Sequence, residues 1–417
     1  MSEIRVLSVE DFDAFVNILV NAYPGWKIAP KDKEGKERVK QRLLEAHQEE
    51  PTITGYGLFR DGVLQGGMLF HDFRMNCLGT RIAAGGVGQI AVDLLHKKEH
   101  VAKEMTLYFL RHYRERGAPM AMLYPFRPDF YKKMGFGYGT KMNQYRVQPA
   151  GLPKGSSKAH IRYLDKDDRQ ALLDCYNRFL SRTHGMIEKS ERELTRLVEN
   201  PQHQIAGYEE DGRILGYLVF TFEHGENWLI NDICIREFVY ESRAALSELM
   251  TFLATQADQI RHIIFNTQDE FFYYLLLDPR NGSPTLIPDI YHESNIQGVG
   301  LMYRVIHTRR IFDLLRERSF GGQTCRLKLT IEDSLLPENA GCVFLCFEDG
   351  RLNLIDTEDY DVEVCMGVAE FSSLLVGAVN FRSLHKYGLA EISDPGYVGT
   401  IDKVFAVEDK PICTTPF

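Results

Sequence analysis

The chain has 417 residues, a formal net charge of −9, 44% hydrophobic residues and 26% charged residues. This length exceeds one ordinary core, so we expect two or three domains with enough apolar surface for each. The acidic balance argues against broad binding to nucleic acid or to an anionic membrane, since both require a basic face.

The first residues lack an apolar core of signal-peptide length, and no stretch approaches the roughly 20 apolar residues of a membrane span. We therefore expect a cytoplasmic protein. Eight cysteines are scattered along the chain, and only Cys342 and Cys346 lie close together. Because no second pair completes a zinc site, we expect no metal, and mostly buried, reduced thiols.

The first predicted elements are a strand and an amphipathic helix within residues 4–23, with Ser8 as a candidate helix cap. Residues 161–180 repeat this pattern, with Asp165 as the cap. Each copy continues with a hairpin that turns at an Asp-Gly pair. The predicted hairpins are 54–70, turning at Asp61-Gly62, and 205–220, turning at Asp211-Gly212.

After each hairpin the pattern predicts a strand, a helix and a further strand that leads into an aromatic run. The expected strands and helices are 86–92 and 101–116 in the first copy, and 228–235 and 242–260 in the second. This recurrence indicates two tandem copies of one α/β unit. Residues 147–160 are rich in Gly, Pro, Ser and Lys and form a natural linker.

The remainder differs from both copies. A helix is predicted near 309–318, then alternating strand patterns, then a helix near 367–379. The fold class expected is therefore α/β and α+β, with two mixed-sheet domains at 1–150 and 151–300 and an α+β domain at 301–417.

One candidate site lies where a buried strand, Ile90-Ala91-Val92, leads through His96, Lys97 and Lys98 into a helix. A helix N-terminus with nearby cations can bind phosphate, although basic residues before a helix are more often a solvated loop. A second candidate is Tyr131 in "RPDFYKKMGFGYG". Its side chain is either core packing or a proton donor to a leaving group.

The order of strand, basic loop and helix, followed by "LYPFRPDFYKKMGFGYG" and a chain ending on Phe417, resembles the Eis (enhanced intracellular survival) family of GNAT N-acetyltransferases. That family has two tandem GNAT-like units and a sterol carrier protein-like domain. The resemblance covers the whole length and implies acetyl-CoA as co-substrate. It also implies homo-oligomers, hexamers among them.

The resemblance also implies roles for individual residues. Tyr131 falls on the general acid toward the departing thiolate, and the carboxylate of Phe417 falls on the general base. Residues implied to bind acetyl-CoA are Ile90, Ala91, Val92, Lys97, Lys98, Glu99, His100, Val101, Ala102, Lys103, Phe126 and Arg127.

One position departs from the GNAT phosphate-binding motif. His100 stands where glycine lets the backbone approach the phosphates, and Glu99 adds an acid beside an anion. Acetyl-CoA binding is then weakened, reshaped or lost, unless a cationic histidine contacts phosphate. In the second copy Phe271 or Phe272 replaces the tyrosine, so we expect that copy to be structural.

The acceptor implied by the resemblance is an aminoglycoside-like polyamine or a lysine side chain, in an acidic cleft. Tyr23 and Trp26 are either walls of this cleft or residues that close a helix end. The alternative function is a degenerate GNAT scaffold, or a protein that binds a small apolar ligand without turnover. A free carboxylate at Phe417 discriminates between them, because only the enzyme requires it.

Overall fold

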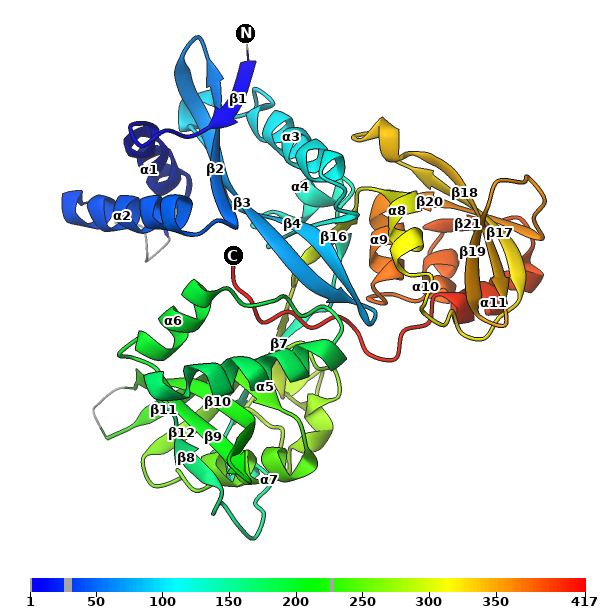
Figure 1. Ribbon diagram of the computed structural model, residues 1–417. Coiled ribbons are helices and arrows are strands. Elements are labelled where there is room, and N and C mark those ends of the chain that lie inside the picture. Colours follow the sequence, from blue (N-terminus) through cyan, green and yellow to red (C-terminus); the bar gives the residue numbers. More distant parts are fainter. Residues whose placement is uncertain (1, 26–31, 226–228) are drawn as a thin grey trace. The chain divides into compact units, whose positions relative to one another are not determined.

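The computed structural model describes residues 2–25, 32–225 and 229–417, which form two compact units. Unit 1 comprises Met1–Gly139, Leu301–Glu408 and Pro416–Phe417, and unit 2 comprises Thr140–Gly300 and Asp409–Thr415. The chain therefore enters each unit more than once. Mixed α/β structure is present in both, as the sequence predicts (Figure 1).

A seven-stranded sheet organises the first part of unit 1, in the order β1-β2-β3-β4-β5-β16-β6. Its strands are β1 (Ser2–Val6), β2 (Ile53–Arg60), β3 (Val63–Cys77), β4 (Thr80–Val92), β5 (Met120–Leu123), β6 (Gly137–Tyr138) and β16 (Met302–Val305). Helices α1 (Asp11–Ala22) and α2 (Lys33–Glu49) cover one face, and α3 (Val101–Glu115) and the short α4 (Pro128–Lys132) cover the other (Figure 1).

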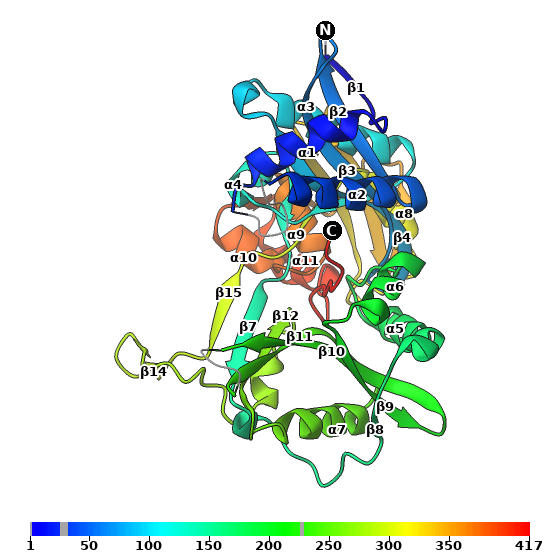
Figure 2. The ribbon, with the colours of Figure 1, turned by 90° about the vertical axis from the view of Figure 1, so that its left-hand side faces the viewer.

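Unit 2 contains a second seven-stranded sheet, in the order β15-β7-β12-β11-β10-β9-β8. Its strands are β7 (Met142–Val147), β8 (Ile161–Tyr163), β9 (Gln204–Glu210), β10 (Arg213–His224), β11 (Asn231–Tyr240), β12 (Ile260–Thr267) and β15 (Asn295–Gly298). Helices α5 (Arg169–Arg182) and α7 (Arg243–Ala254) lie on opposite faces of this sheet, with α6 (Glu191–Glu199) packed beside α5 (Figure 2). A small hairpin, β13 (Leu286–Ile287) and β14 (Tyr291–His292), precedes β15.

Two strands lie in a sheet that the order of elements along the chain does not reveal. The sequence suggests boundaries at residues 150 and 300, whereas β7 already pairs with β12 in the second sheet. In the other direction, β16 follows the second copy and pairs with β5 and β6 in the first sheet. Both strands are short, at six and four residues, and so short a pattern fits either sheet and does not identify its partner.

The two predicted hairpin turns are confirmed. Asp61 and Gly62 have φ of 51° and 77°, and Asp211 and Gly212 have φ of 51° and 73°. Positive φ at both central residues is the type I′ turn, whose twist matches the strands that it joins. The internal repeat is thus present in the turn chemistry as well as in the order of elements.

The predicted helix ends are only partly right. Asp165 does cap, accepting from Asp167 N at the start of a short 3-10 turn that leads into α5. Ser8 does not cap α1, because its amide and hydroxyl both donate to Asp11 Oδ2 at 2.8 Å and the helix begins at Asp11. Helix α7 ends at Ala254, and Ile260 begins a strand instead.

The rest of unit 1 is the predicted α+β domain, built on a five-stranded sheet in the order β19-β18-β17-β20-β21. Its strands are β17 (Cys325–Glu332), β18 (Gly341–Glu348), β19 (Arg351–Ile355), β20 (Val362–Gly367) and β21 (Ala390–Ile392). Its helices are α8 (Thr308–Leu314), α9 (Val368–Leu375), α10 (Phe381–Lys386) and α11 (Val398–Val404). Across the described ranges, no helix has the length and hydropathy needed to cross a bilayer.

A buried ion pair joins this domain to the first sheet within unit 1. Arg304 on β16 donates to Asp333 Oδ1 at 2.8 Å, and the two side chains are 0% and 1% exposed. Arg304 Nε also donates to the carbonyl of Met134, while Asp333 accepts from Leu336 N and Asn339 Nδ2. Every charge in the cluster is thus compensated, which is the condition for burying it.

Asp333→Ala leaves the Arg304 guanidinium buried without its counter-charge. We expect it to lower the free energy of unfolding by about 3–5 kcal/mol, seen as a large fall in the melting temperature of the full chain. Asp356→Ala removes the partner of Arg309 in an exposed pair and serves as the control, with an expected cost under about 1 kcal/mol. Equal melting temperatures for the two variants would contradict this role of Arg304.

Candidate functional site

The site begins with a bulge in β4. Across β3, Ala91 pairs with Gly67 and Gly88 pairs with Leu69, so two residues of β4 stand opposite one residue of β3. Gln89 takes up the extra length with φ of 52°. A bulge bends its strand and ends regular pairing, which often re-aims the residues of a site.

Beyond the bulge β4 and β5 separate. Their parallel pairing covers only Ala84, Gly85 and Gly86, although β4 continues to Val92. Two cavities lie at the opening, and they share Ile90 and Phe126 as lining residues. The two cavities therefore adjoin at these two residues.

The first cavity, of about 820 Å³, is cationic. Its lining brings together the predicted strand, loop and helix N-terminus with Phe126 and Arg127. The full lining is Ile90, Val92, His96, Lys97, Lys98, His100, Val101, Ala102, Lys103, Phe126, Arg127, Phe130, Lys133, Met134, Ser334 and Leu335. No aspartate or glutamate is among these described residues, which suits the cavity to an anion.

Neither Glu99 nor His100 disturbs the cationic cavity in the way that its side-chain type suggests. Glu99 does not line the cavity, and its carboxylate meets Arg60 at 3.4 Å and His96 at 3.1 Å. His100 adopts φ of 63°, the left-handed conformation that glycine adopts most easily. The backbone path of a glycine loop is therefore kept, at a strain of about 1–2 kcal/mol. Lys98 is left-handed too, with φ of 67°.

The N-terminus of α3 has no side-chain cap. His100 makes no such hydrogen bond to the first turn, and Val101, Ala102 and Lys103 line the cavity there. In unit 2 the corresponding helix α7 is capped by Ser242, which accepts from Ala245 N. The first copy alone thus presents uncapped helix amides beside paired lysines, the arrangement that binds phosphate.

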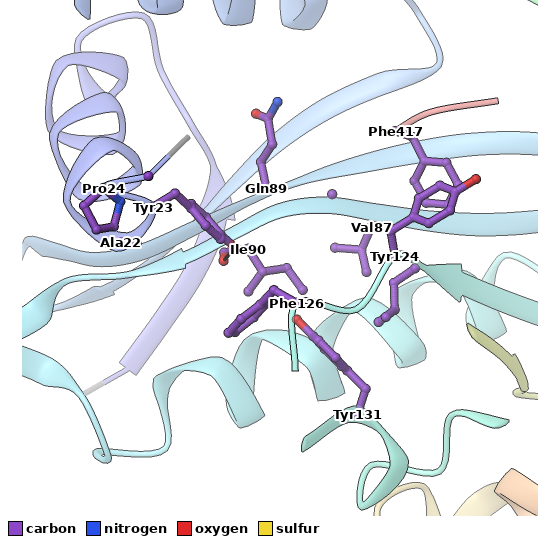
Figure 3. A pocket seen from close by; sticks show the side chains of 13 residues that line it. Ala22, Tyr23, Pro24, Val87, Gln89, Ile90, Tyr124, Phe126, Tyr131 and Phe417 are labelled. Atoms are coloured by element: carbon purple, nitrogen blue, oxygen red, sulfur yellow. Dashed lines mark hydrogen bonds between the residues drawn. The ribbon is translucent and has the colours of Figure 1, made fainter. Parts of the chain in front are cut away.

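The second cavity, of about 520 Å³, is aromatic (Figure 3). Phe126 makes edge-to-face contacts with Tyr23 and with Tyr131, at ring centroid distances of 5.9 and 6.0 Å. Tyr131, on α4, is 2% exposed, and burial raises its pKa above the usual value for tyrosine. Its hydroxyl is therefore held in the protonated form.

Tyr23 closes the end of helix α1 and also lines the aromatic cavity. It is the C-cap of α1, where its backbone N–H donates to the Leu19 carbonyl. It also lines the aromatic cavity, and its hydroxyl donates to the Ile90 carbonyl at 2.6 Å. Desolvation raises the Tyr23 pKa to about 12. Trp26, its expected partner, lies outside the described residues.

Phe417, the last residue of the sequence, lies in the aromatic cavity. Its ring contacts Phe73 at a centroid distance of 4.8 Å. It also contacts Tyr124, at 5.1 Å (Figure 3). Its carboxyl carbon lies against Gly88, because a Cβ on that glycine would be 3.0 Å from it. The bare backbone of Gly88 is therefore what leaves room for the carboxyl group beside the bulge.

His71, on β3, borders the same spot and was not predicted. The Cβ position of Gly88 is 3.3 Å from His71 Nε2, and the His71 and Phe417 rings are 5.6 Å apart. Burial lowers the His71 pKa to about 4, which keeps the imidazole neutral at physiological pH. A polar residue in the apolar run "GGMLFHDF" was the available signal, and Gln89 in "GGVGQIAV" was a second one.

Among the described residues, those predicted for the site lie around the two cavities, with two exceptions. Ala91 is buried and lines neither cavity, and Glu99 is not in the lining because its carboxylate contacts Arg60 and His96. The acidic cleft expected for the acceptor is absent from the described lining of the aromatic cavity, which contains no aspartate or glutamate. In unit 2, Phe272 is core and Phe271 is exposed, with no tyrosine at either position.

Models of known protein families match most of the chain. The acetyltransferase (GNAT) domain matches twice, over residues 3–139 and 179–305. The sterol carrier protein domain matches residues 312–414. Each of the two repeated units and the α+β domain is therefore matched by a family model.

Relatives and solved structures are similar to this chain over most or all of its length. A Streptomyces avermitilis protein described as an uncharacterized N-acetyltransferase is 21% identical over 97% of both chains. One from Streptomyces griseus is 24% identical over 81% of this chain and 83% of the relative. The fold is shared with a GCN5-related N-acetyltransferase from Anabaena variabilis (TM-score 0.82, 16% identity) and with Eis1 from Mycobacterium abscessus (TM-score 0.76, 20% identity), each covering both chains completely.

Lys97→Ala combined with Lys98→Ala removes two cations from the cationic cavity. We expect the dissociation constant of acetyl-CoA, measured by calorimetry, to rise at least about tenfold, because charge-assisted contacts to phosphate are lost. The dependence of binding on salt should also become shallower. The control is Lys386→Ala, an exposed lysine of α10 outside the cavity lining, which should bind like the parent. Unchanged affinity in the double variant would refute the assignment of the cavity.

Proposed function

Because the chain is an Eis-like GNAT N-acetyltransferase, with two acetyltransferase domains and a sterol carrier protein domain, we propose that it transfers acetyl from acetyl-CoA to an amine in the first domain. The observation that carries this proposal is the junction at Ile90 and Phe126. There a cationic cavity meets an aromatic one that holds Tyr131 and Phe417. A reaction between an anionic acyl donor and an amine needs such a pair of sites.

The cationic cavity fits the phosphates of acetyl-CoA, through Lys97, Lys98 and Lys103 and the free amides at the start of α3. The pantetheine arm would run between the separated strands β4 and β5, along the backbone of Ile90 to Val92. His100 is compatible with this, since its backbone already follows the left-handed path. Phe126 and Arg127 would border the cofactor on the other side.

The proposed reaction is direct transfer. The amine nitrogen attacks the thioester carbonyl carbon and loses a proton toward the Phe417 carboxylate, and the carbon–sulfur bond breaks. Tyr131 donates its hydroxyl proton to the departing thiolate. Holding both substrates at one junction supplies much of the acceleration, because it replaces an encounter in solution.

The base in this proposal is weak, which limits how it can act. A carboxylate takes a proton from an ammonium only where the amine pKa is depressed or a relay assists. Neutral His71 lies beside the carboxyl group and can accept one. The proposal takes Phe417 as the end of the mature chain, which mass spectrometry of the purified protein checks.

The second GNAT domain is proposed to be structural. Its helix N-terminus is capped by Ser242, and Arg236, a cation on β11 before that helix, contacts Glu223 at 3.3 Å. Unit 2 also holds the last part of the chain, since Ile412 N donates to the His184 carbonyl and Cys413 N to Gln268 Oε1. Homo-oligomer formation, with a hexamer among the expected forms, and a cytoplasmic location stay predictions.

Two variants test the assigned roles. Tyr131→Phe removes the proton donor, and we expect kcat to fall about 100-fold or more while acetyl-CoA still binds. One alanine added after Phe417 displaces the carboxylate, with a similar loss expected. Because burial raises the Tyr131 pKa, the parent rate should not decline through loss of this proton below about pH 10.

Thiol release from acetyl-CoA in the presence of an amine is the readout, and calorimetry of acetyl-CoA is the control for folding. Full activity in both variants would contradict the roles of Tyr131 as acid and Phe417 as base, but the protein would still be an acetyltransferase. If the parent itself neither binds acetyl-CoA nor releases thiol, the scaffold or ligand-binding alternative takes its place.

A further inference from the structure

The aromatic cavity has the character of a site for one particular class of amine. We infer that the acceptor carries a single positive charge on a flat apolar body, as an arylalkylamine does, and that polycationic amines are poor acceptors. This inference rests on the proposed function, because it concerns what the aromatic cavity receives. It differs from the aminoglycoside-like polyamine that the resemblance implies.

The charge of the lining is the first argument. The described residues around the cavity are Ala22, Tyr23, Pro24, Gly25, Val87, Gly88, Gln89, Ile90, Leu123, Tyr124, Phe126, Tyr131 and Phe417. None has a charged side chain, so the α-carboxylate of Phe417 is the one counter-charge that this lining offers. It can compensate one ammonium group, and further ammonium groups would enter without a partner, which is costly.

The shape and chemistry of the walls are the second argument. Tyr23, Phe126 and Tyr131 form an edge-to-face series at one end, and Tyr124 packs against Phe417 at the other (Figure 3). Rings prefer such offset or edge contacts with another ring. A cavity of about 520 Å³ between these walls has room for one aromatic group with its amine directed to the carboxylate.

Gly25 provides a way to change the charge without disturbing the walls. It lines the cavity, has no left-handed φ, and a Cβ added there meets no atom of the described residues within 4 Å, its chain neighbours aside. Gly25→Asp therefore adds a carboxylate at the edge of the site. Gly298→Asp, on β15 of unit 2, has the same open space and is the matched control.

The experiment measures kcat/KM of the full chain with 2-phenylethylamine, spermidine and N-acetyl-lysine amide. For the parent we expect kcat/KM for 2-phenylethylamine to exceed kcat/KM for spermidine at least about tenfold, the effect of one uncompensated charge. In Gly25→Asp the ratio of these two kcat/KM values should fall by about tenfold, and in Gly298→Asp it should not change.

Three results would overturn the inference, and they separate it from the proposed function. Spermidine or N-acetyl-lysine amide as the preferred acceptor of the parent would overturn the substrate class and leave the acetyltransferase standing. A ratio that does not respond to Gly25→Asp would show that charge in this cavity does not select the acceptor. A parent that binds no acetyl-CoA and acetylates none of the three amines would remove the proposed function and the inference together.

Discussion

The separation of β4 from β5 after Gly86 is the constraint on which the rest of the site depends. The bulge at Gln89 turns β4 away while β3 keeps it in the sheet, so the strands open without loss of the core. A regular parallel pair would satisfy its own backbone groups and leave no passage. With the opening in place, Ile90 borders two cavities of opposite character.

The two cavities divide the chemistry by charge. The cationic cavity contains lysine and arginine side chains, a loop that is left-handed at Lys98 and His100, and the uncapped N-terminus of α3. Aromatic rings and one α-carboxylate line the other cavity. Buried Tyr131 lines the aromatic cavity beside Phe126, and burial raises its pKa, which suits a group that must keep its proton until a leaving group forms. The carboxylate can lie close to β4 because Gly88 has no side chain.

Local patterns made much of this arrangement predictable. The Asp-Gly turns, the repeat and the basic loop at Lys97 and Lys98 before a helix follow from short-range spacing, and the structure keeps them. The partners of β7 and β16 could not be predicted, because strands this short fit either sheet. The place of His71 beside Phe417 and the contact of Glu99 with Arg60 depend on residues that are far apart in the sequence.

The central claim is that the two cavities form one site for two substrates, joined at Ile90 and Phe126. The most direct test is calorimetry with a bisubstrate analogue, coenzyme A linked through an acetyl bridge to the nitrogen of 2-phenylethylamine. If both cavities are filled together, this compound should bind about 100-fold more tightly than acetyl-CoA, because the second contact becomes intramolecular. An affinity no better than that of acetyl-CoA would contradict the claim.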